Sequence, residues 1–177
     1  VDLHLHTTAS DGVLSPSEIV RYAKAKGLQA IAITDHDTIE GCKEGLAEGE
    51  RIGFEVIPGI EISAEHFPGT MHILGFFLDI HHPFLNERLK FLQKARAERN
   101  PKIVEKLNGV GIDITFEEVL RASGGGQVGR PHFANVLLEK KYVRSFQEAF
   151  DRFLKKGAPA YVEKCRFTSK EALHLIN

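Results

Sequence analysis

The chain has 177 residues, a formal net charge of −1, 42% hydrophobic residues and 27% charged residues. This length predicts one principal domain with room for a substantial core. No signal peptide and no apolar stretch of membrane-spanning length is evident, so we expect a soluble, cytoplasmic protein without membrane association. The two isolated cysteines suit a reducing compartment. The chain begins inside a strand pattern without Met and ends inside a helical pattern, so we expect that both ends were trimmed or continue beyond this sequence.

The first six residues predict a strand with two histidines on one face. Strand side chains alternate between faces, which places Asp2, His4 and His6 opposite Val1, Leu3 and Leu5. Two imidazoles at this spacing can point at one metal ion. For this pattern alone, a strand with two partly buried histidines is an equally good interpretation.

The next segments alternate between helix and strand patterns. A capping box, Ser15-Pro16-Ser17-Glu18, begins a helix that ends at Gly27. A second helix is expected to about Gly53, with Asp37 and Glu40 as a capping box. Further strands are expected over residues 28–33, 55–63 and 71–78. This alternation favours parallel βα units.

Residues 84–156 show only helical patterns and carry most of the positive charge. Asn100-Pro101 should restart a helix, and Thr115-x-x-Glu118 and Ser145-x-x-Glu148 are capping boxes. The segment has 15 basic and 9 acidic residues, whereas the remainder has 8 and 15. We therefore expect a barrel segment over residues 1–83 and a helical insertion over 84–156 that covers the barrel mouth and faces an anionic substrate. Solvated basic helices are the alternative. The barrel should resume over 157–177, with a strand near Tyr161-Val162 and a helix at Thr168-x-x-Glu171.

Four successive elements each offer a metal-ligand type of side chain. Asp11 follows the first strand, His36 follows the second, Glu61 lies near the end of the third, and His72 lies in the fourth. Active sites of barrel enzymes gather at the carboxyl ends of the strands. A set of His, Asp and Glu without sulfur suits manganese, with iron or zinc as alternatives, and Glu61 could bridge two ions.

This set resembles the PHP family, which is named for polymerases and histidinol phosphatases. The matching stretches are Asp2-Leu-His-Leu-His6, Ser10-Asp-Gly12, Ile33-Thr-Asp-His-Asp37, Gly59-Ile-Glu61, His72-Ile-Leu-Gly75 and Gly129-Arg-Pro-His132. The resemblance implies an α/β fold, a distorted (β/α)7 barrel that is incomplete in this chain, with a cluster of two or three metal ions. Members of the family are mostly phosphoesterases.

Carried over by position, the resemblance implies three ligand groups. The groups are His4, His6 and Glu61 for one ion, Glu61, His72 and His132 for a second, and Asp11 and His36 for a third. The family completes its first and third ions with a late Asp-x-His motif. No Asp-x-His follows His132 in this sequence, which leaves the third ion only two protein ligands.

Gly129-Arg130-Pro131-His132 inside the helical insertion is similar to the subgroup that removes the 3′-phosphate from nucleoside 3′,5′-bisphosphates and trims short RNA from its 5′ end. The resemblance implies a metal-dependent phosphoric ester hydrolase with a nucleotide or short oligonucleotide as substrate and no obligate protein partner. Arg130, Asp11 and His36 are its candidate catalytic residues. Arg130 and His132 are candidate substrate-binding residues, because a planar guanidinium matches phosphate oxygens. A surface ion pair is the alternative for Arg130.

Three other functions remain open. One is a PHP phosphatase of another small ester, of the histidinol-phosphate type. A second is a metal-dependent amide or amine hydrolase, which typically adds a bridging lysine on a middle strand, although the third and fourth strands here contain none. The third is a non-catalytic PHP module, which would be expected to lose ligands, whereas seven candidates are present.

Overall fold

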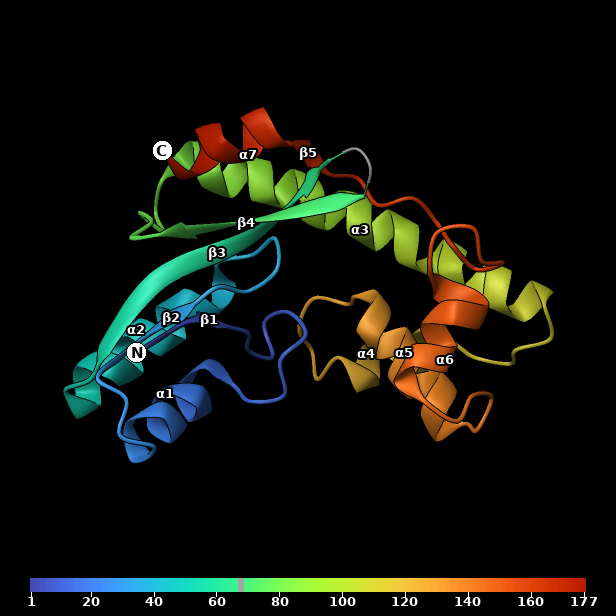
Figure 1. Cartoon of the computed structure of the whole chain (residues 1–177), viewed down its shortest axis with the longest axis horizontal. Helices are drawn as coiled ribbons and strands as arrows, with labels where there is room; N and C mark the ends of the chain where they lie inside the picture. Colours follow the sequence, from blue (N-terminus) through green and yellow to red (C-terminus); the bar gives the residue numbers. More distant parts are fainter. Residues whose placement is uncertain (67–68) are drawn as a thin grey trace. The chain divides into compact units, whose positions relative to one another are not determined.

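The computed structural model describes residues 1–66 and 69–177. The chain divides into two compact units (Figure 1). Unit 1 consists of Val1–Gln93 and Arg166–Asn177, and unit 2 consists of Lys94–Cys165. Among the described residues, no helix has both the length and the apolar character needed to cross a bilayer.

Unit 1 is built on a mixed sheet whose first half is parallel. Its principal strands are β1 (Asp2–Leu5), β2 (Ala30–Ile33), β3 (Glu55–Glu65) and β4 (Thr70–Phe76), in the order β1-β2-β3-β4. The helices α1 (Pro16–Ala25) and α2 (Glu40–Ile52) connect the first three strands, which pair in parallel. The predicted α/β class with parallel βα units is thus confirmed for this half of the sheet.

The fourth strand departs from the parallel pattern. β4 pairs antiparallel with β3, from Gly59 opposite Phe76 to Glu65 opposite Thr70. The reason is the connection between Glu65 and Thr70, which is far too short for the crossover that a parallel pair requires. β3 therefore pairs with β2 through residues 55–58 and with β4 through residues 59–65.

The helix ends of unit 1 follow the sequence signals in part. Ser15 and Glu18 form the predicted capping box, and α2 ends at Gly53, whose φ of 64° suits glycine. The predicted capping box of Asp37 and Glu40 is wrong, because α2 begins after Ile39 without a side-chain cap. The Asp37 carboxylate instead accepts the backbone N–H of Ser63 in β3.

The last segment returns to the sheet. β5 (Phe167–Thr168) pairs in parallel with β3, and α7 (Ser169–Ile176) begins with the predicted capping box of Thr168 and Glu171. The strand expected near Tyr161-Val162 is wrong, since the returning strand starts only at Phe167. The helices α1, α2 and α7 share one apolar core with Ile60 and Ile62 of β3, and α7 contacts both β3 and β4.

The core of unit 1 explains why one face of β3 carries a polar site. Ile60 and Ile62 are completely buried, together with Ile31 and Ile33 of β2. Because side chains alternate along a strand, Glu61 points to the face opposite Ile60 and Ile62. The apolar packing of its two neighbours therefore fixes the direction of the Glu61 carboxylate.

Unit 2 has its own helical core. The helix α3 (Pro83–Gly109) begins in unit 1 and ends in unit 2, where it is followed by α4 (Phe116–Ala122), α5 (Arg130–Glu139), α6 (Phe146–Ala149) and a short π-helix, η1 (Phe150–Leu154). The buried residues include Ile103, Leu107, Phe133, Leu137 and Leu154.

Two sequence signals in this region need correction. The predicted restart at Asn100-Pro101 is wrong, because α3 continues through Pro101. Tertiary contacts override the local signal here, since the buried Asn100 amide donates to the carbonyl oxygen of Val128 at 3.1 Å. Thr115 and Glu118 form the predicted capping box, whereas Ser145 caps α6 without the reciprocal bond: Glu148 accepts from the backbone N–H of Arg144 instead.

Candidate metal centre

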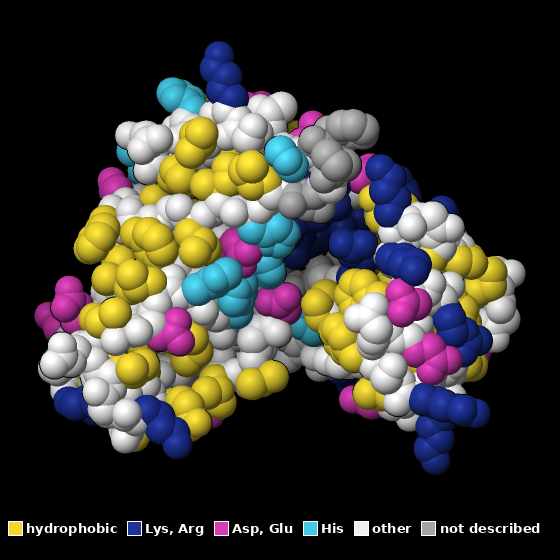
Figure 2. Space-filling view, in the orientation of Figure 1, with side chains coloured by type: hydrophobic (Ala, Val, Ile, Leu, Met, Phe, Trp, Pro, Cys, Tyr) yellow, Lys and Arg dark blue, Asp and Glu magenta, His cyan; other side chains and the backbone are white. Residues whose placement is uncertain are grey.

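The candidate centre lies in unit 1, where loops and strands bring five ligand-type side chains around Glu61. His4 lies in β1 and His6 directly follows it, while His36 follows β2 and His72 lies in β4. The fifth residue, Asp11, lies in the loop after β1. Histidine side chains (cyan) gather beside acidic side chains (magenta) on the face drawn in Figure 2.

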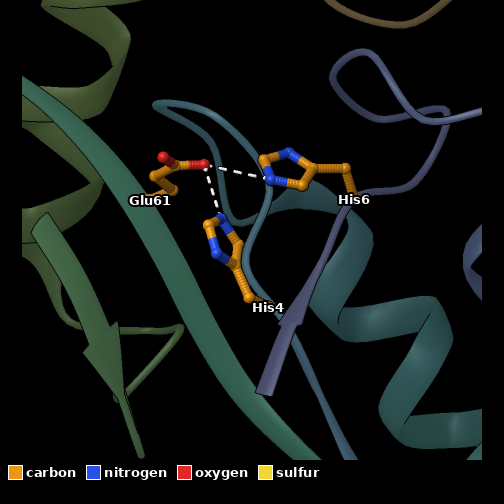
Figure 3. A group of neighbouring side chains, drawn as sticks. All are labelled: His4, His6 and Glu61. Atoms are coloured by element: carbon orange, nitrogen blue, oxygen red, sulfur yellow. Dashed lines mark hydrogen bonds and ion pairs between the residues drawn. The ribbon is translucent and has the colours of Figure 1, made fainter. Parts of the chain in front are cut away.

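The Glu61 carboxylate is the centre of this cluster. Its Oε2 atom lies 3.0 Å from Nε2 of His4 and 3.0 Å from Nε2 of His6 (Figure 3). Nδ1 of His36 lies 3.3 Å from the same oxygen, and Nδ1 of His72 lies 2.5 Å from Oε1. One carboxylate, only 5% exposed, therefore contacts four imidazole rings.

Asp11 supplies a second carboxylate on the other side of two of these rings. Its Oδ1 lies 3.3 Å from Nδ1 of His6, and its Oδ2 lies 3.8 Å from Nε2 of His36. The rings of His6 and His36 are tilted against each other with centroids 4.6 Å apart. These two histidines thus lie between Asp11 and Glu61, with each ring presenting one nitrogen to each carboxylate.

The two carboxylates strongly influence the protonation of the cluster. Burial alone would lower the pKa of His6, but its hydrogen bonds to Asp11 and Glu61 outweigh burial and raise the pKa to about 9. Burial would likewise raise the pKa of Glu61, yet hydrogen bonds from His6, His72 and His4 hold it far below the usual range. The cluster therefore contains an ionised carboxylate, that of Glu61, which can accept a positive partner.

The ligand atoms fall into three groups, within each of which all the atoms lie within 4.8 Å of one another. The groups are His4, His6 and Glu61; His6, Asp11 and His36; and His36, Glu61 and His72. Imidazole nitrogen and carboxylate oxygen suit Mn²⁺, Fe²⁺ or Zn²⁺, so the donor set fits divalent ions. A neutral imidazole offers one lone pair, so His6 and His36 can each serve only one ion at a time. The three groups are therefore partly alternatives rather than three independent sites.

The remaining predicted ligand, His132, lies in unit 2 at the start of α5. It is 5% exposed, and its Nδ1 accepts a hydrogen bond from the backbone N–H of Gly129 at 2.9 Å. In the neutral ring this bond places the proton on Nε2, which then acts as a donor. In this conformation the neutral ring thus offers a hydrogen bond rather than a lone pair to any group that meets Nε2.

Arg130 is held by its neighbours within unit 2. Its guanidinium donates to the carbonyl oxygen of Leu154 at 3.1 Å and lies 5.8 Å from the ring centroid of Phe150 and 5.9 Å from that of Tyr161. These contacts connect α5 to both ends of the π-helix. The Arg130 guanidinium thus has a carbonyl oxygen and two aromatic rings as partners within unit 2.

Sequence reasoning missed the residues that support the cluster. Asp35 and Asp37, on either side of His36, are both 1% exposed and bind neighbouring loops and strands through their carboxylates. The signal was present in Thr34-Asp35-His36-Asp37, where two acidic residues directly follow an apolar strand. Acidic residues in loops are usually exposed, so the sequence alone did not distinguish these two from surface residues.

The chain matches the model of a known family and several known proteins. Residues 2–164 match the PHP domain. A 5′-3′ exoribonuclease of Haemophilus influenzae is 38% identical over 92% of this chain and 59% of the relative. A 3′,5′-nucleoside bisphosphate phosphatase of Chromobacterium violaceum is 33% identical over 92% of this chain and 57% of the relative. The chain thus spans less than two thirds of the length of these curated relatives.

A solved structure has the same fold over nearly the whole chain. It is described as an amidohydrolase from Chromobacterium violaceum with bound sulfate and no metal, and it is 32% identical. It superposes with a TM-score of 0.91 and covers 99% of this chain, which in turn covers 62% of that structure.

Proposed function

Because the chain belongs to the PHP domain family, we propose that it forms part of a metal-dependent phosphoesterase. The observation that carries this proposal is the buried Glu61 carboxylate in contact with four imidazole rings from separate elements of unit 1. A solvated surface would not concentrate so many nitrogen ligands around one carboxylate. A purely structural role would not require a second carboxylate, Asp11, on the far side of two of the rings.

We propose manganese as the resident metal, with iron or zinc as alternatives, and two or three ions per site. His4, His6, Asp11, His36, Glu61 and His72 are the proposed ligands. His132, which the resemblance also implied, is not kept as a ligand, because its neutral ring is a donor at Nε2. Divalent ions supply Lewis acidity in such a site, by activating water as a nucleophile and neutralising charge on the phosphoryl oxygens. Glu61 would bind two of the ions at once. Asp11 and His36 would act as catalytic residues.

The proposed substrates are nucleoside 3′,5′-bisphosphates, which would lose the 3′-phosphate, and short RNA, which would be trimmed from its 5′ end. The names of the two curated relatives support this choice. The side chains of unit 2 also support it, because Arg130 carries a positive charge and His132 is a donor at Nε2 in its neutral form. Both would bind phosphate oxygens by charge-assisted or neutral hydrogen bonds.

The rival reaction is hydrolysis of an amide or amine, which the description of the Chromobacterium structure suggests for that protein. A bridging lysine on a middle strand is typical of such enzymes. β3 and β4 contain no lysine, so the residues of this chain favour phosphate esters. We also propose a reducing, cytoplasmic setting, in which Cys42 and Cys165 stay unpaired.

The test is a metal-dependent assay of the full chain. Protein stripped with a chelator and reloaded with Mn²⁺ should release inorganic phosphate from adenosine 3′,5′-bisphosphate and mononucleotides from a 5′-phosphorylated short RNA. The metal-free protein should release neither. Equal turnover with and without metal would contradict the proposal, and cleavage of an amide substrate without phosphate release would favour the rival.

A further inference from the structure

The pairing of His36 with Glu61 depends on the two residues that flank His36. The backbone N–H of Glu61 donates to the carbonyl oxygen of Asp35 at 3.1 Å, and the N–H of Asp37 donates to the carbonyl oxygen of Glu61 at 3.0 Å. Together these bonds form a single parallel bridge between His36 and Glu61. The bridge is what brings the imidazole of His36 beside the carboxylate of Glu61.

We propose that Asp35 and Asp37, the two buried carboxylates on either side of His36, are positioning residues: Asp35 holds the loop that carries Asp11, and Asp37 holds β3 and β4 beyond Glu61. This inference rests on the proposed metal-dependent function. It adds that the ligands of unit 1 are held in place by the protein before an ion binds.

Asp37 replaces a backbone interaction that the chain cannot make. In a continued parallel ladder, the N–H of Ser63 would donate to the carbonyl oxygen of residue 37. The backbone of Asp37 turns away with a φ of 54°, a left-handed conformation that Asp tolerates better than most residues. Its side chain takes over, because Oδ1 accepts the N–H of Ser63 at 2.9 Å. Ser63 lies opposite His72 in the β3–β4 pair, so this bond also fixes the strand that carries His72.

Asp35 performs the corresponding task for the loop after β1. Its Oδ1 accepts the backbone N–H of Thr7 at 2.7 Å and the hydroxyl of Ser10 at 2.5 Å, and its Oδ2 accepts the hydroxyl of Thr7 at 2.7 Å. These donors stand at the start of the loop and directly before Asp11. The carboxylate has little spare room, since a Cβ on Gly41 would lie 2.7 Å from Oδ2.

A direct ligand role for these two carboxylates fits the structure less well. Neither Asp35 nor Asp37 belongs to the groups of converging ligand atoms found among the described residues. Their oxygens face backbone and hydroxyl donors of Thr7, Ser10 and Ser63 instead. Partners that orient metal ligands typically contribute 10- to 100-fold to metal affinity. Asp35 and Asp37 are placed to make a contribution of that size.

The experiment separates the hydrogen bond of Asp37 from its backbone conformation. Asp37→Asn keeps an oxygen for the N–H of Ser63. Asp37→Gly tolerates the positive φ but removes that oxygen. Mn²⁺ affinity of the full chain, measured by calorimetry, should be close to wild type for Asp37→Asn and weaker by roughly 10- to 100-fold for Asp37→Gly. Asp35→Asn should weaken binding similarly, because its amide nitrogen cannot accept one of the present donors. The control is Glu55→Gln, which changes an exposed carboxylate at the other end of β3.

A second readout uses the metal-free protein. The NMR signals of the histidine rings should shift in Asp35→Asn and Asp37→Gly, and melting temperature should show that both variants remain folded. Unchanged ring signals together with wild-type Mn²⁺ affinity would overturn the positioning role. If the wild-type protein binds no Mn²⁺ but the variants still shift the ring signals, the positioning role is supported. The same result would contradict the proposed metal-dependent function.

Discussion

Gly12 lies directly against the backbone of His6. A Cβ on Gly12 would be 2.2 Å from the carbonyl oxygen of His6 and 2.7 Å from the nitrogen of Thr7. The N–H of Gly12 also donates to the carbonyl oxygen of Thr7 at 2.9 Å, which closes the loop that carries Asp11. The glycine after Asp11 is therefore required by close packing of backbone on backbone rather than by an unusual φ.

Gly12→Ala should accordingly destabilise the fold by about 1–3 kcal/mol, the usual cost of forcing an extra methyl group into a packed region. Urea denaturation measures this change as a lower midpoint. Gly109→Ala is the matched control, because a Cβ at Gly109 near the end of α3 meets no atom within 4 Å. An unchanged midpoint for Gly12→Ala would show that the loop can move away from His6 at no cost.

Glu61→Gln should lower bound metal and activity together. The amide keeps the size of the side chain but removes the charge that four histidines contact. The loss of Mn²⁺ affinity should exceed the roughly 10- to 100-fold effect typical of partners that only orient a ligand. Metal analysis of the purified variant, alongside turnover, is the measurement. Full metal content with normal turnover would exclude a bridging role for Glu61.

Arg130→Ala should discriminate between substrates. Losing one charge-assisted phosphate contact costs about 1.5–3 kcal/mol, or roughly a 10- to 150-fold change. We expect kcat/KM for a nucleoside 3′,5′-bisphosphate to fall by about this factor. Hydrolysis of a simple aryl phosphate should change much less, because that substrate has no second phosphate.

Two further variants make the Arg130 result interpretable. Arg152→Ala removes another arginine of unit 2, one that pairs with Glu148, and should leave both substrates unaffected. Arg130→Lys keeps the charge but not the planar donor pair, and should recover only part of the bisphosphate activity. If Arg130→Ala slows both substrates equally, Arg130 acts on the scissile phosphate and does not select the substrate.

The ion pairs of Glu48 predict an acid-sensitive contribution to stability. The side chain is 8% exposed and contacts Arg51 and Arg21 at 2.7 Å and 2.9 Å. The hydrogen bonds from Arg51 lower the pKa of Glu48 most. Burial opposes this effect and Arg21 adds to it, so that the pKa falls to about 2. Because the folded pKa lies below the unfolded value of about 4.3, the stabilisation is complete above that value and lost as pH falls towards 2.

Glu48→Gln should therefore lower the melting temperature at pH 7, and the difference from wild type should shrink steadily below pH 4. A difference that is the same at pH 7 and pH 3 would contradict this assignment.

The sequence predicted which His and Glu side chains converge in unit 1 better than it predicted the residues that support them. His4, His6, Glu61 and His72 were found because strand alternation is a strict two-residue rule that side chains follow whatever surrounds them. The antiparallel direction of β4 was missed because the prediction relied on the hydrophobic pattern, which is the same in either direction, and not on the short connection after β3. Asp37 was wrongly predicted to cap a helix. An Asp that caps a helix and an Asp whose side chain replaces a backbone acceptor between strands can have the same neighbours in the sequence. The contacts of Asp37 with Ser63 are set by tertiary structure alone.

The pairing of β5 with β3 has a consequence for the order in which the protein folds. Ala64 pairs with Phe167, and all of unit 2 lies between them in the sequence. The contacts of β1, β2, α1 and α2 form within the first part of the chain, and the helices of unit 2 form largely from sequence neighbours. β5 and α7 must wait until the intervening chain has been synthesised and has closed a long loop, a step that costs entropy before it gains any contact. We expect β5 and α7 to be the last part of unit 1 to acquire protection in pulsed hydrogen exchange, and the first part to lose it when the protein opens.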